Sequence, residues 1–200
     1  MNPGEVRSTS RPEALASPGV RLAPRVLGIV IGAAVVALAA QVAVPLSITR
    51  VPLTLQPLAV LVVGGLLGAT GGAAALVLYL AAGASGLPVF AGGAAGALYL
   101  IGPTGGYLLA YPVAAGLVGW LCQRGAAQTG SRAAVATLLA CALGMLVVHI
   151  GGISQLTLIT GNATAAYRLG FVPFFANDLV KVGLAAVLIL VLRPRLRAIR

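Results

Sequence analysis

The chain has 200 residues, of which 60% are hydrophobic and only 8% are charged, and its mean hydropathy is +1.05. These values lie well outside the usage of soluble domains and argue against a water-soluble fold. The formal net charge of +10 would suggest nucleic acid as a partner of a soluble protein, but the basic residues are scattered singly along or beside apolar segments, so we expect no nucleic-acid binding.

Charged residues are rare in the central part of the chain, which predicts a membrane domain. Residues 26–192 hold six of them: Arg50, Arg124, Arg132, Arg168, Asp178 and Lys181. Because a spanning helix needs roughly 20 apolar residues, this stretch accommodates five or six spans. We expect an all-α integral membrane protein with six transmembrane helices within residues 25–193. A disordered basic cytoplasmic tail is expected at residues 1–24, and a second basic cytoplasmic tail at 194–200.

The expected helices follow from the apolar runs and from the Pro and Gly residues between them. They are placed at residues 26–44, 58–69, 73–83, 105–121, 133–159 and 174–192. Three prolines break helical continuity in the loop 45–57, and Gly71-Gly72 predicts a tight turn between the second and third spans. The glycine-rich segment 86–103 carries no charge, which is typical of irregular backbone that lines a protein cavity.

The first span also fits a second interpretation. A basic tail, an apolar run and Ala37-Leu38-Ala39 before Ala40 describe a secretory signal with a small-residue cleavage site. Apolar residues continue through Val44, which gives enough length to span, so a retained helix is favoured. Loss of this helix would leave five spans with the same outer loops.

The distribution of basic residues predicts the orientation, because cytoplasmic loops are enriched in Lys and Arg. With the N-terminus inside, only Arg50 and Arg168 fall in outer segments. The ten basic residues of the inner segments are Arg7, Arg11, Arg21, Arg25, Arg124, Arg132, Arg193, Arg195, Arg197 and Arg200. The irregular segments 45–57, 86–103 and 160–177 then lie on the outer face, which predicts a site loaded from outside.

Several kinds of chemistry are missing from the sequence. One histidine, His149, and two cysteines cannot build a four-ligand zinc site, and no Ser–His–acid set is available. Residues 125–132 read G-x-x-x-x-G-S-R, which lacks the lysine of a phosphate loop. We therefore expect neither an enzyme nor a cofactor nor a metal site, and the protein cannot drive transport with ATP by itself.

Asp178 and Lys181 are the most informative residues, because ionisable side chains within a spanning helix are unfavourable and usually face the bundle interior. Their i, i+3 spacing places both on one helical face, where carboxylate and ammonium can partly neutralise each other. One interpretation is an ion pair that only fixes helix packing. A ligand pocket is favoured, because the pair lies near the outer end of the sixth span.

Five motifs together suggest a family. They are Val51-Pro-Leu-Thr-Leu-Gln-Pro57, Tyr79, Gly86-Leu-Pro-Val-Phe-Ala-Gly-Gly93, Gly102-Pro-Thr-Gly-Gly-Tyr107 and Val172-Pro-Phe-Phe-Ala-Asn-Asp-Leu-Val-Lys181. They resemble BioY, the biotin-binding S component of energy-coupling factor (ECF) transporters. The resemblance implies a multi-pass protein of the bacterial inner membrane that captures biotin from outside. It also implies an ECF transmembrane coupling protein and cytoplasmic ATPase subunits as partners, besides membrane lipid.

The resemblance also implies roles for individual residues. Asp178 would accept the ureido N–H groups of biotin, and Lys181 would orient Asp178 or meet a polar ligand atom. The remaining implied binding residues are Thr54, Gln56, Phe90, Gly92, Gly93 and Tyr107. Family members often carry a polar side chain near Gly92, so backbone or water would replace one hydrogen bond here.

Small residues four apart on the first span, Gly28/Gly32 and Ala33/Ala37, permit close helix approach. The resemblance implies that they face the coupling protein, although internal packing would use the same pattern. Three alternatives stay open for the function: an S component for another vitamin, a membrane subunit that does not transport, and a solitary importer that needs no coupling module.

Overall fold

The computed structural model describes residues 18–198. The long helices are α1 (Pro18–Gln41), α2 (Gln56–Ala84), α3 (Gly105–Arg124), α4 (Gly130–Thr160) and α6 (Phe175–Ala198). Shorter elements are strands β1 (Ala43–Leu46) and β2 (Thr49–Thr54), helix α5 (Ala163–Gly170) and the 3₁₀ turns η1 (Ala91–Gly93), η2 (Ala97–Ile101) and η3 (Gly125–Ala127). Residues 18–24, expected to belong to the N-terminal tail, are helical, whereas residues 1–17 of that tail lie outside the described residues.

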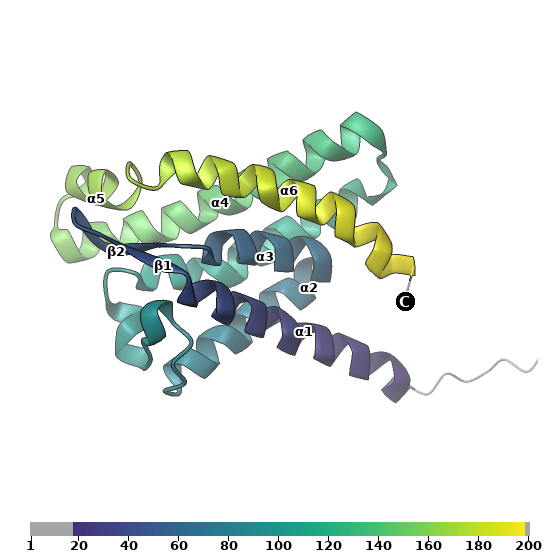
Figure 1. Cartoon of the computed structure of the whole chain (residues 1–200), viewed down its shortest axis with the longest axis horizontal. Helices are drawn as coiled ribbons and strands as arrows, with labels where there is room; N and C mark the ends of the chain where they lie inside the picture. Colours follow the sequence, from purple (N-terminus) through teal and green to yellow (C-terminus); the bar gives the residue numbers. More distant parts are fainter. Residues whose placement is uncertain (1–17, 199–200) are drawn as a thin grey trace, which may run out of the picture.

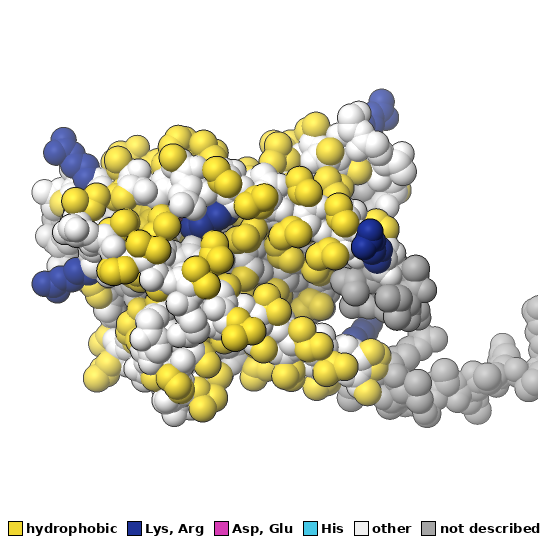
Figure 2. All heavy atoms as spheres, viewed as in Figure 1, with side chains coloured by type: hydrophobic (Ala, Val, Ile, Leu, Met, Phe, Trp, Pro, Cys, Tyr) yellow, Lys and Arg dark blue, Asp and Glu magenta, His cyan; other side chains and the backbone are white. Residues whose placement is uncertain are grey.

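The described part of the chain has five helices that are long and apolar enough to cross a membrane. Many large apolar side chains on these helices are exposed, which suits contact with lipid rather than water. Figure 2 shows hydrophobic side chains over the middle of the visible face and basic side chains mainly at its two ends. The molecule is therefore an all-helical membrane fold with a small strand pair at one end.

Helix α2, which is one of these five long helices, contains a sharp reversal of the chain. Gly68 has φ of +80° and ψ of −178°, so the helix is interrupted there. A Cβ built on Gly72 would lie 2.8 Å from the Cα of Gly64, although eight residues of straight helix extend about 12 Å. The chain thus folds back on itself near Gly68, as Figure 1 shows. The sequence predicts two spans in this region with a turn at Gly71-Gly72, a few residues later than the observed break.

The loop expected at residues 45–57 contains an antiparallel strand pair. β1 and β2 pair in the register Ala43↔Thr54, Val44↔Leu53 and Leu46↔Thr49. The register is irregular between Val44 and Leu46, where Pro45 has no N–H to donate. Because β1 begins at Ala43, α1 ends at Gln41 instead of continuing to Val44. Val51 and Thr54 of β2 are buried, so this hairpin covers the end of the helix bundle.

Glycines allow the helices to approach closely. A Cβ on Gly64 would collide with the carbonyl oxygen of Ala115 on α3, and one on Gly119 of α3 would collide with the backbone of Gly68. Between α3 and α4, a Cβ on Gly106 would similarly meet the carbonyl oxygen of Gly151. Small-residue contacts of this kind are the usual basis of helix association in lipid.

The elements divide between the two ends of the molecule. The described chain ends and the connection between α3 and α4 lie at one end (Figure 1). β1, β2 and α5 lie at the opposite end (Figure 1). We refer to the latter as the hairpin end. The irregular segments that the sequence placed on one face, around residues 45–57 and 160–177, are therefore on the same side of the bundle.

The close α2–α3 contact predicts that Gly64→Ala destabilises the protein. The added methyl group collides with the main chain of Ala115, and overpacking of this kind costs about 1–3 kcal/mol. Gly183→Ala on α6 is the matched control, because a Cβ there meets nothing within 4 Å. We expect thermal unfolding in detergent at a lower temperature for Gly64→Ala and no loss for Gly183→Ala. Equal melting temperatures of the two variants would contradict the proposed helix contact.

Candidate functional site

A cavity at the hairpin end collects most of the polar residues of the bundle. Its empty space, with the solvent-filled mouth included, is about 530 Å³. β2, the start of α2, the segment 91–104, α3, α4 and the start of α6 all contribute to its wall. The lining residues are Val51, Pro52, Thr54, Gln56, Pro57, Ala91, Tyr99, Thr104, Tyr107, Leu108, Tyr111, Val148, His149, Phe174, Asp178 and Lys181.

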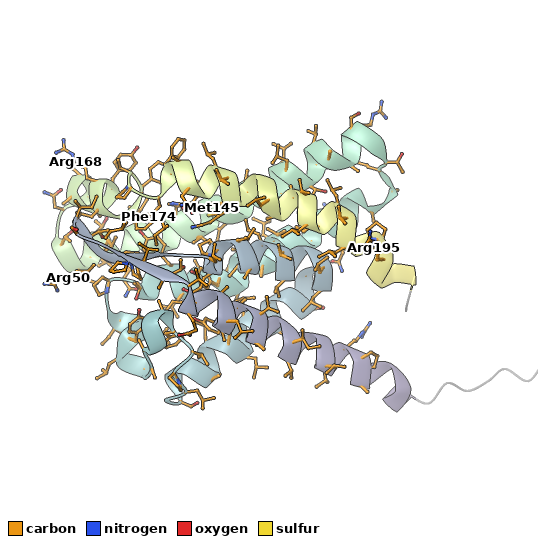
Figure 3. The ribbon with its side chains drawn as sticks, in the orientation of Figure 1. Arg50, Met145, Arg168, Phe174 and Arg195 are labelled. Carbon is orange, nitrogen blue, oxygen red and sulfur yellow. The ribbon has the colours of Figure 1, made fainter. Side chains whose placement is uncertain are left out.

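The floor of the cavity is a chain of three ionisable side chains. Lys181 Nζ donates to Asp178 Oδ1 at 2.7 Å, and His149 Nε2 lies 3.2 Å from Asp178 Oδ2. All three residues are buried, with relative exposures of 3% for Lys181, 6% for Asp178 and 5% for His149. On its other side, the His149 ring contacts the carbonyl oxygen of Met145. In the view of Figure 3, Phe174 is seen between Arg168, at the hairpin end, and Met145. The carboxylate thus has a basic side chain on each oxygen.

The local structure explains why a carboxylate is tolerated here. Asp178 lies in the first turn of α6, where the helix dipole favours negative charge. Its backbone N–H donates to the carbonyl of Phe174 at 2.8 Å, which anchors this turn. An ionised carboxylate offers about four acceptor positions, and Lys181 and His149 occupy two of them. Acceptor capacity therefore remains for a ligand that donates N–H groups.

A second polar group forms the wall beside β2. Thr54 Oγ1 donates to Gln56 Oε1 at 3.3 Å, and Gln56 Nε2 donates to the Tyr79 hydroxyl at 2.5 Å. The Tyr79 hydroxyl donates in turn to the carbonyl of Val89 at 3.3 Å. This chain of hydrogen bonds fixes the Gln56 amide at the start of α2 and ties it to the glycine-rich segment.

Aromatic side chains form the rest of the enclosure. Tyr107 is buried, and its hydroxyl donates to the carbonyl of Gly170 at 2.7 Å, which fixes the end of α5 against α3. Tyr99 lines the cavity and stacks on Phe90 with ring centroids 5.2 Å apart. Phe90 also meets Tyr79 edge to face at 5.6 Å. Flat apolar surfaces beside a polar floor suit a compact ring system with polar edges.

The structure brings together five of the eight predicted binding residues in this cavity: Thr54, Gln56, Tyr107, Asp178 and Lys181. Phe90 is fully buried behind Tyr99 and does not line the cavity. Gly92 and Gly93 are exposed in left-handed conformations, with φ of +67° and +76°, at the turn that follows Ala91. These three residues therefore do not line the cavity, and their contact with a ligand stays a prediction.

The small residues of α1 face the interior. Gly32 and Ala33 are buried, whereas Gly28 and Ala37 are half-buried. A Cβ on Gly32 would lie 3.0 Å from Leu67 and Val63 and 3.1 Å from Ala75, all on α2. Spacing alone does not tell which partner such a face meets, and here α2 occupies it. Gly28 likewise lies near Leu67, so α2 occupies the face that carries these two glycines. Docking of a coupling protein through the small residues of α1 stays a prediction.

Sequence reasoning missed several residues of the site, and His149 is the most important. It lies 29 positions from Asp178, so no local spacing pattern connects the two. A signal was nevertheless present, since His149 is the only histidine of the chain and stands in the middle of a long apolar segment. Tyr99, Thr104, Tyr111 and Phe174 were also missed, although each stands within or close to a quoted motif.

The arrangement offers hydrogen-bond donors and acceptors to a small molecule. Among residues 18–198 no cluster of three His, Cys, Asp or Glu side chains is placed to hold a metal ion. Asp178 supplies acceptors, Lys181 supplies donors, and Gln56 and Thr54 supply both. A small molecule with several N–H donors and a carbonyl acceptor would therefore be complementary to the cavity.

Comparisons with known proteins agree with this description. The model of the BioY family matches residues 13–198. A probable biotin transporter BioY of Pyrococcus horikoshii is 36% identical over 155 residues, covering 78% of this chain and 87% of the relative. The biotin transporter BioY of Thermotoga maritima is 34% identical over 161 residues, covering 80% and 90%. These relatives are named as transporters, not as enzymes.

A solved structure gives the same result at the level of the fold. The crystal structure of the S-component for biotin from an ECF-type ABC transporter matches with a TM-score of 0.81 and 25% identity, covering 90% of this chain and 95% of that one. The resemblance inferred from the sequence motifs is confirmed by these matches. The chain therefore belongs to the BioY family.

Proposed function

We propose that this protein is the substrate-capture component of a biotin uptake transporter. The observation that carries the proposal is the buried Asp178–Lys181 pair at the floor of an open cavity at the hairpin end. A family of biotin transporters and a biotin S-component of the same fold support biotin as the ligand. Charges buried in a membrane domain are usually functional, which favours binding over a purely structural ion pair.

Biotin fits the chemistry of the cavity. Its ureido ring presents two N–H donors and one carbonyl acceptor, and the fused rings are otherwise apolar. Asp178 would accept the ureido N–H groups at its remaining lone pairs. The second N–H of the Gln56 amide is available for the ureido carbonyl, and Tyr99 and Tyr107 would enclose the rings.

The residues that do not line the cavity have supporting roles in this proposal. Phe90 stacks on Tyr99 and so fixes the wall. Gly92 and Gly93 adopt left-handed backbone that other residues rarely take, and thereby form the turn that places Ala91 at the cavity. A side chain at these positions would strain the turn without filling the cavity.

The proposed topology has six membrane-embedded helical segments, with both termini in the cytoplasm of a bacterial cell. The support is the reversal of α2 at Gly68, which divides this helix into two arms. Arg50 and Arg168 project at the hairpin end, whereas Arg195 lies at the opposite end, near the last described residues of α6 (Figure 3). Because basic residues accumulate on the cytoplasmic side, the hairpin end would face outward in the inner membrane.

Energy for uptake would come from partner proteins. The sequence has no phosphate loop, because the near match at residues 125–132 lacks the required lysine. This segment forms η3 and the start of α4 and does not line the cavity. A membrane coupling protein and cytoplasmic ATPases would supply the missing function. We expect the coupling protein to meet α1 at the small residues Gly28, Gly32, Ala33 and Ala37, of which the two glycines also lie against α2.

Ligand binding tests the proposal first. We expect isothermal titration of the purified protein with biotin to give submicromolar affinity, and titration with thiamine or riboflavin to give no comparable heat. Asp178→Asn should weaken biotin binding strongly, because hydrogen bonds to a charged acceptor contribute roughly 1.5–3 kcal/mol each. Arg168→Ala is the control, since an exposed arginine in the last turn of α5 should change affinity by less than about threefold.

Three outcomes would contradict the proposal, and they can be distinguished. A folded protein that binds thiamine or riboflavin instead of biotin would be an S component for another vitamin. A folded protein that binds none of the three would support a membrane subunit in which Asp178 and Lys181 only fix helix packing. Equal affinities of Asp178→Asn and Arg168→Ala would place the ligand outside the described cavity.

Transport tests the partner requirement separately. In reconstituted vesicles we expect biotin uptake only when the coupling protein, the ATPase subunits and ATP are all present, because this chain has no nucleotide-binding motif of its own. The measurement is the initial rate of radiolabelled biotin accumulation, with the partner subunits alone as the control. Uptake at full rate without partners or ATP would establish a solitary importer.

A further inference from the structure

Tyr79 is a buried residue behind the wall of the cavity. Its side chain is 1% exposed, and it is not one of the described residues that line the cavity. It stands on the second arm of α2, 23 positions after Gln56, and along a straight helix the two residues would be about 34 Å apart. The reversal at Gly68 brings them together, so that the Gln56 amide contacts the Tyr79 hydroxyl at 2.5 Å. Tyr79 therefore reaches the cavity through Gln56.

The acceptor that Tyr79 meets fixes the direction of its hydroxyl hydrogen. The hydroxyl lies 3.3 Å from the carbonyl oxygen of Val89, and a carbonyl oxygen can only accept. The hydrogen of Tyr79 thus points to Val89, and the hydroxyl oxygen is left to accept from Gln56. The Gln56 atom that lies against Tyr79 must then be the amide nitrogen, Nε2, which determines the orientation of the amide.

Thr54 completes this chain of hydrogen bonds but does not determine its direction. Its Oγ1 accepts from the backbone N–H of Gln56 and donates to Gln56 Oε1, both at 3.3 Å. A hydroxyl can either donate or accept at one place, so Thr54 would adapt to both orientations of the amide. The Tyr79 hydroxyl, whose hydrogen is held by the Val89 carbonyl, is therefore the group that distinguishes the amide nitrogen from the amide oxygen.

The orientation of Gln56 decides which atom this wall offers to a ligand. An amide nitrogen carries two hydrogens, and Tyr79 accepts one of them. The second hydrogen remains for an acceptor in the cavity that Gln56 lines. This wall thus donates, whereas the Asp178 carboxylate on α6 accepts, so the two polar groups of the cavity select opposite atoms of a ligand.

We propose that Tyr79 is a positioning residue that determines specificity: it holds the Gln56 amide with Nε2 as a donor, so that the site selects a ligand with an acceptor at that place. The inference rests on the proposed function, in which this acceptor is the ureido oxygen of biotin. Without the Tyr79 hydroxyl, the amide can turn over and offer its oxygen instead. Discrimination between an acceptor and a donor on the ligand is then lost, although the cavity keeps its shape.

Two ligands that differ at this one group measure the effect. In 2-iminobiotin, a protonated nitrogen replaces the ureido oxygen at neutral pH, so it donates hydrogens where biotin accepts one. Tyr79→Phe keeps the ring and its edge-to-face contact with Phe90 but removes the hydroxyl. We expect Tyr79→Phe to bind biotin about three- to tenfold more weakly than the wild type and to bind 2-iminobiotin no more weakly. The ratio of the two affinities should thus fall by about threefold or more, as measured by displacement of radiolabelled biotin from purified protein.

Three further variants separate positioning from a general loss of structure. Tyr167→Phe is the matched control, because this tyrosine is exposed on α5 and is not one of the described residues that line the cavity, so neither affinity should change. Gln56→Leu removes the amide itself and should lower the affinity ratio at least as far as Tyr79→Phe does. Adding Tyr79→Phe to Gln56→Leu should change biotin affinity by less than about twofold, because the amide through which the hydroxyl acts is already gone.

The outcomes separate this inference from the proposed function. Equal proportional losses for biotin and 2-iminobiotin in Tyr79→Phe would overturn the positioning role, as would a full effect of Tyr79→Phe in the Gln56→Leu background. Biotin binding by the wild type would leave the proposed function standing in both cases. A wild-type affinity ratio in Gln56→Leu would overturn the positioning role even if Tyr79→Phe failed to fold. If the wild-type protein binds no biotin, the proposed function is wrong and the inference is wrong with it.

Discussion

The contact between Asp178 and Lys181 is the interaction on which the rest of the site depends. A lone carboxylate or ammonium buried in a membrane domain would be strongly unfavourable, and the 2.7 Å pair removes most of that penalty. The i, i+3 spacing makes the pair local to α6, so it forms wherever this helix forms. Asp178 in the first turn of α6 and Lys181 both line the cavity, and His149 on α4 contacts the other oxygen of the carboxylate.

The surrounding helices and the β1–β2 hairpin enclose the Asp178–Lys181 pair. Glycines on α2, α3 and α4 let the helices approach to main-chain contact, and the cavity is lined by aromatic residues such as Tyr99, Tyr107 and Tyr111. The β1–β2 hairpin places Thr54 and leads directly into Gln56, so one short segment supplies both the cover and a polar wall. Tyr107 fixes the end of α5 through Gly170, and this contact orients the approach to α6.

Much of this was predictable from the sequence, for identifiable reasons. The apolar runs predicted the membrane helices, and the i, i+3 spacing predicted the Asp178–Lys181 contact because it is local. The His149–Asp178 contact joins two helices and has no local signature. The sequence predicted a break within residues 58–83 but not its position at Gly68, since Gly71-Gly72 is an equally plausible turn. The small residues of α1 indicated a close helix contact, yet their spacing could not show that α2 occupies that face.

An experimental structure of the protein with bound biotin would test the central claim most directly. The account predicts that at least one ureido nitrogen lies within about 2.7–3.2 Å of an Asp178 carboxyl oxygen, while Lys181 and His149 keep their contacts with the same carboxylate. A complex in which biotin is well ordered but its ureido nitrogens are bound by other groups, with Asp178 contacting only Lys181 and His149, would contradict it.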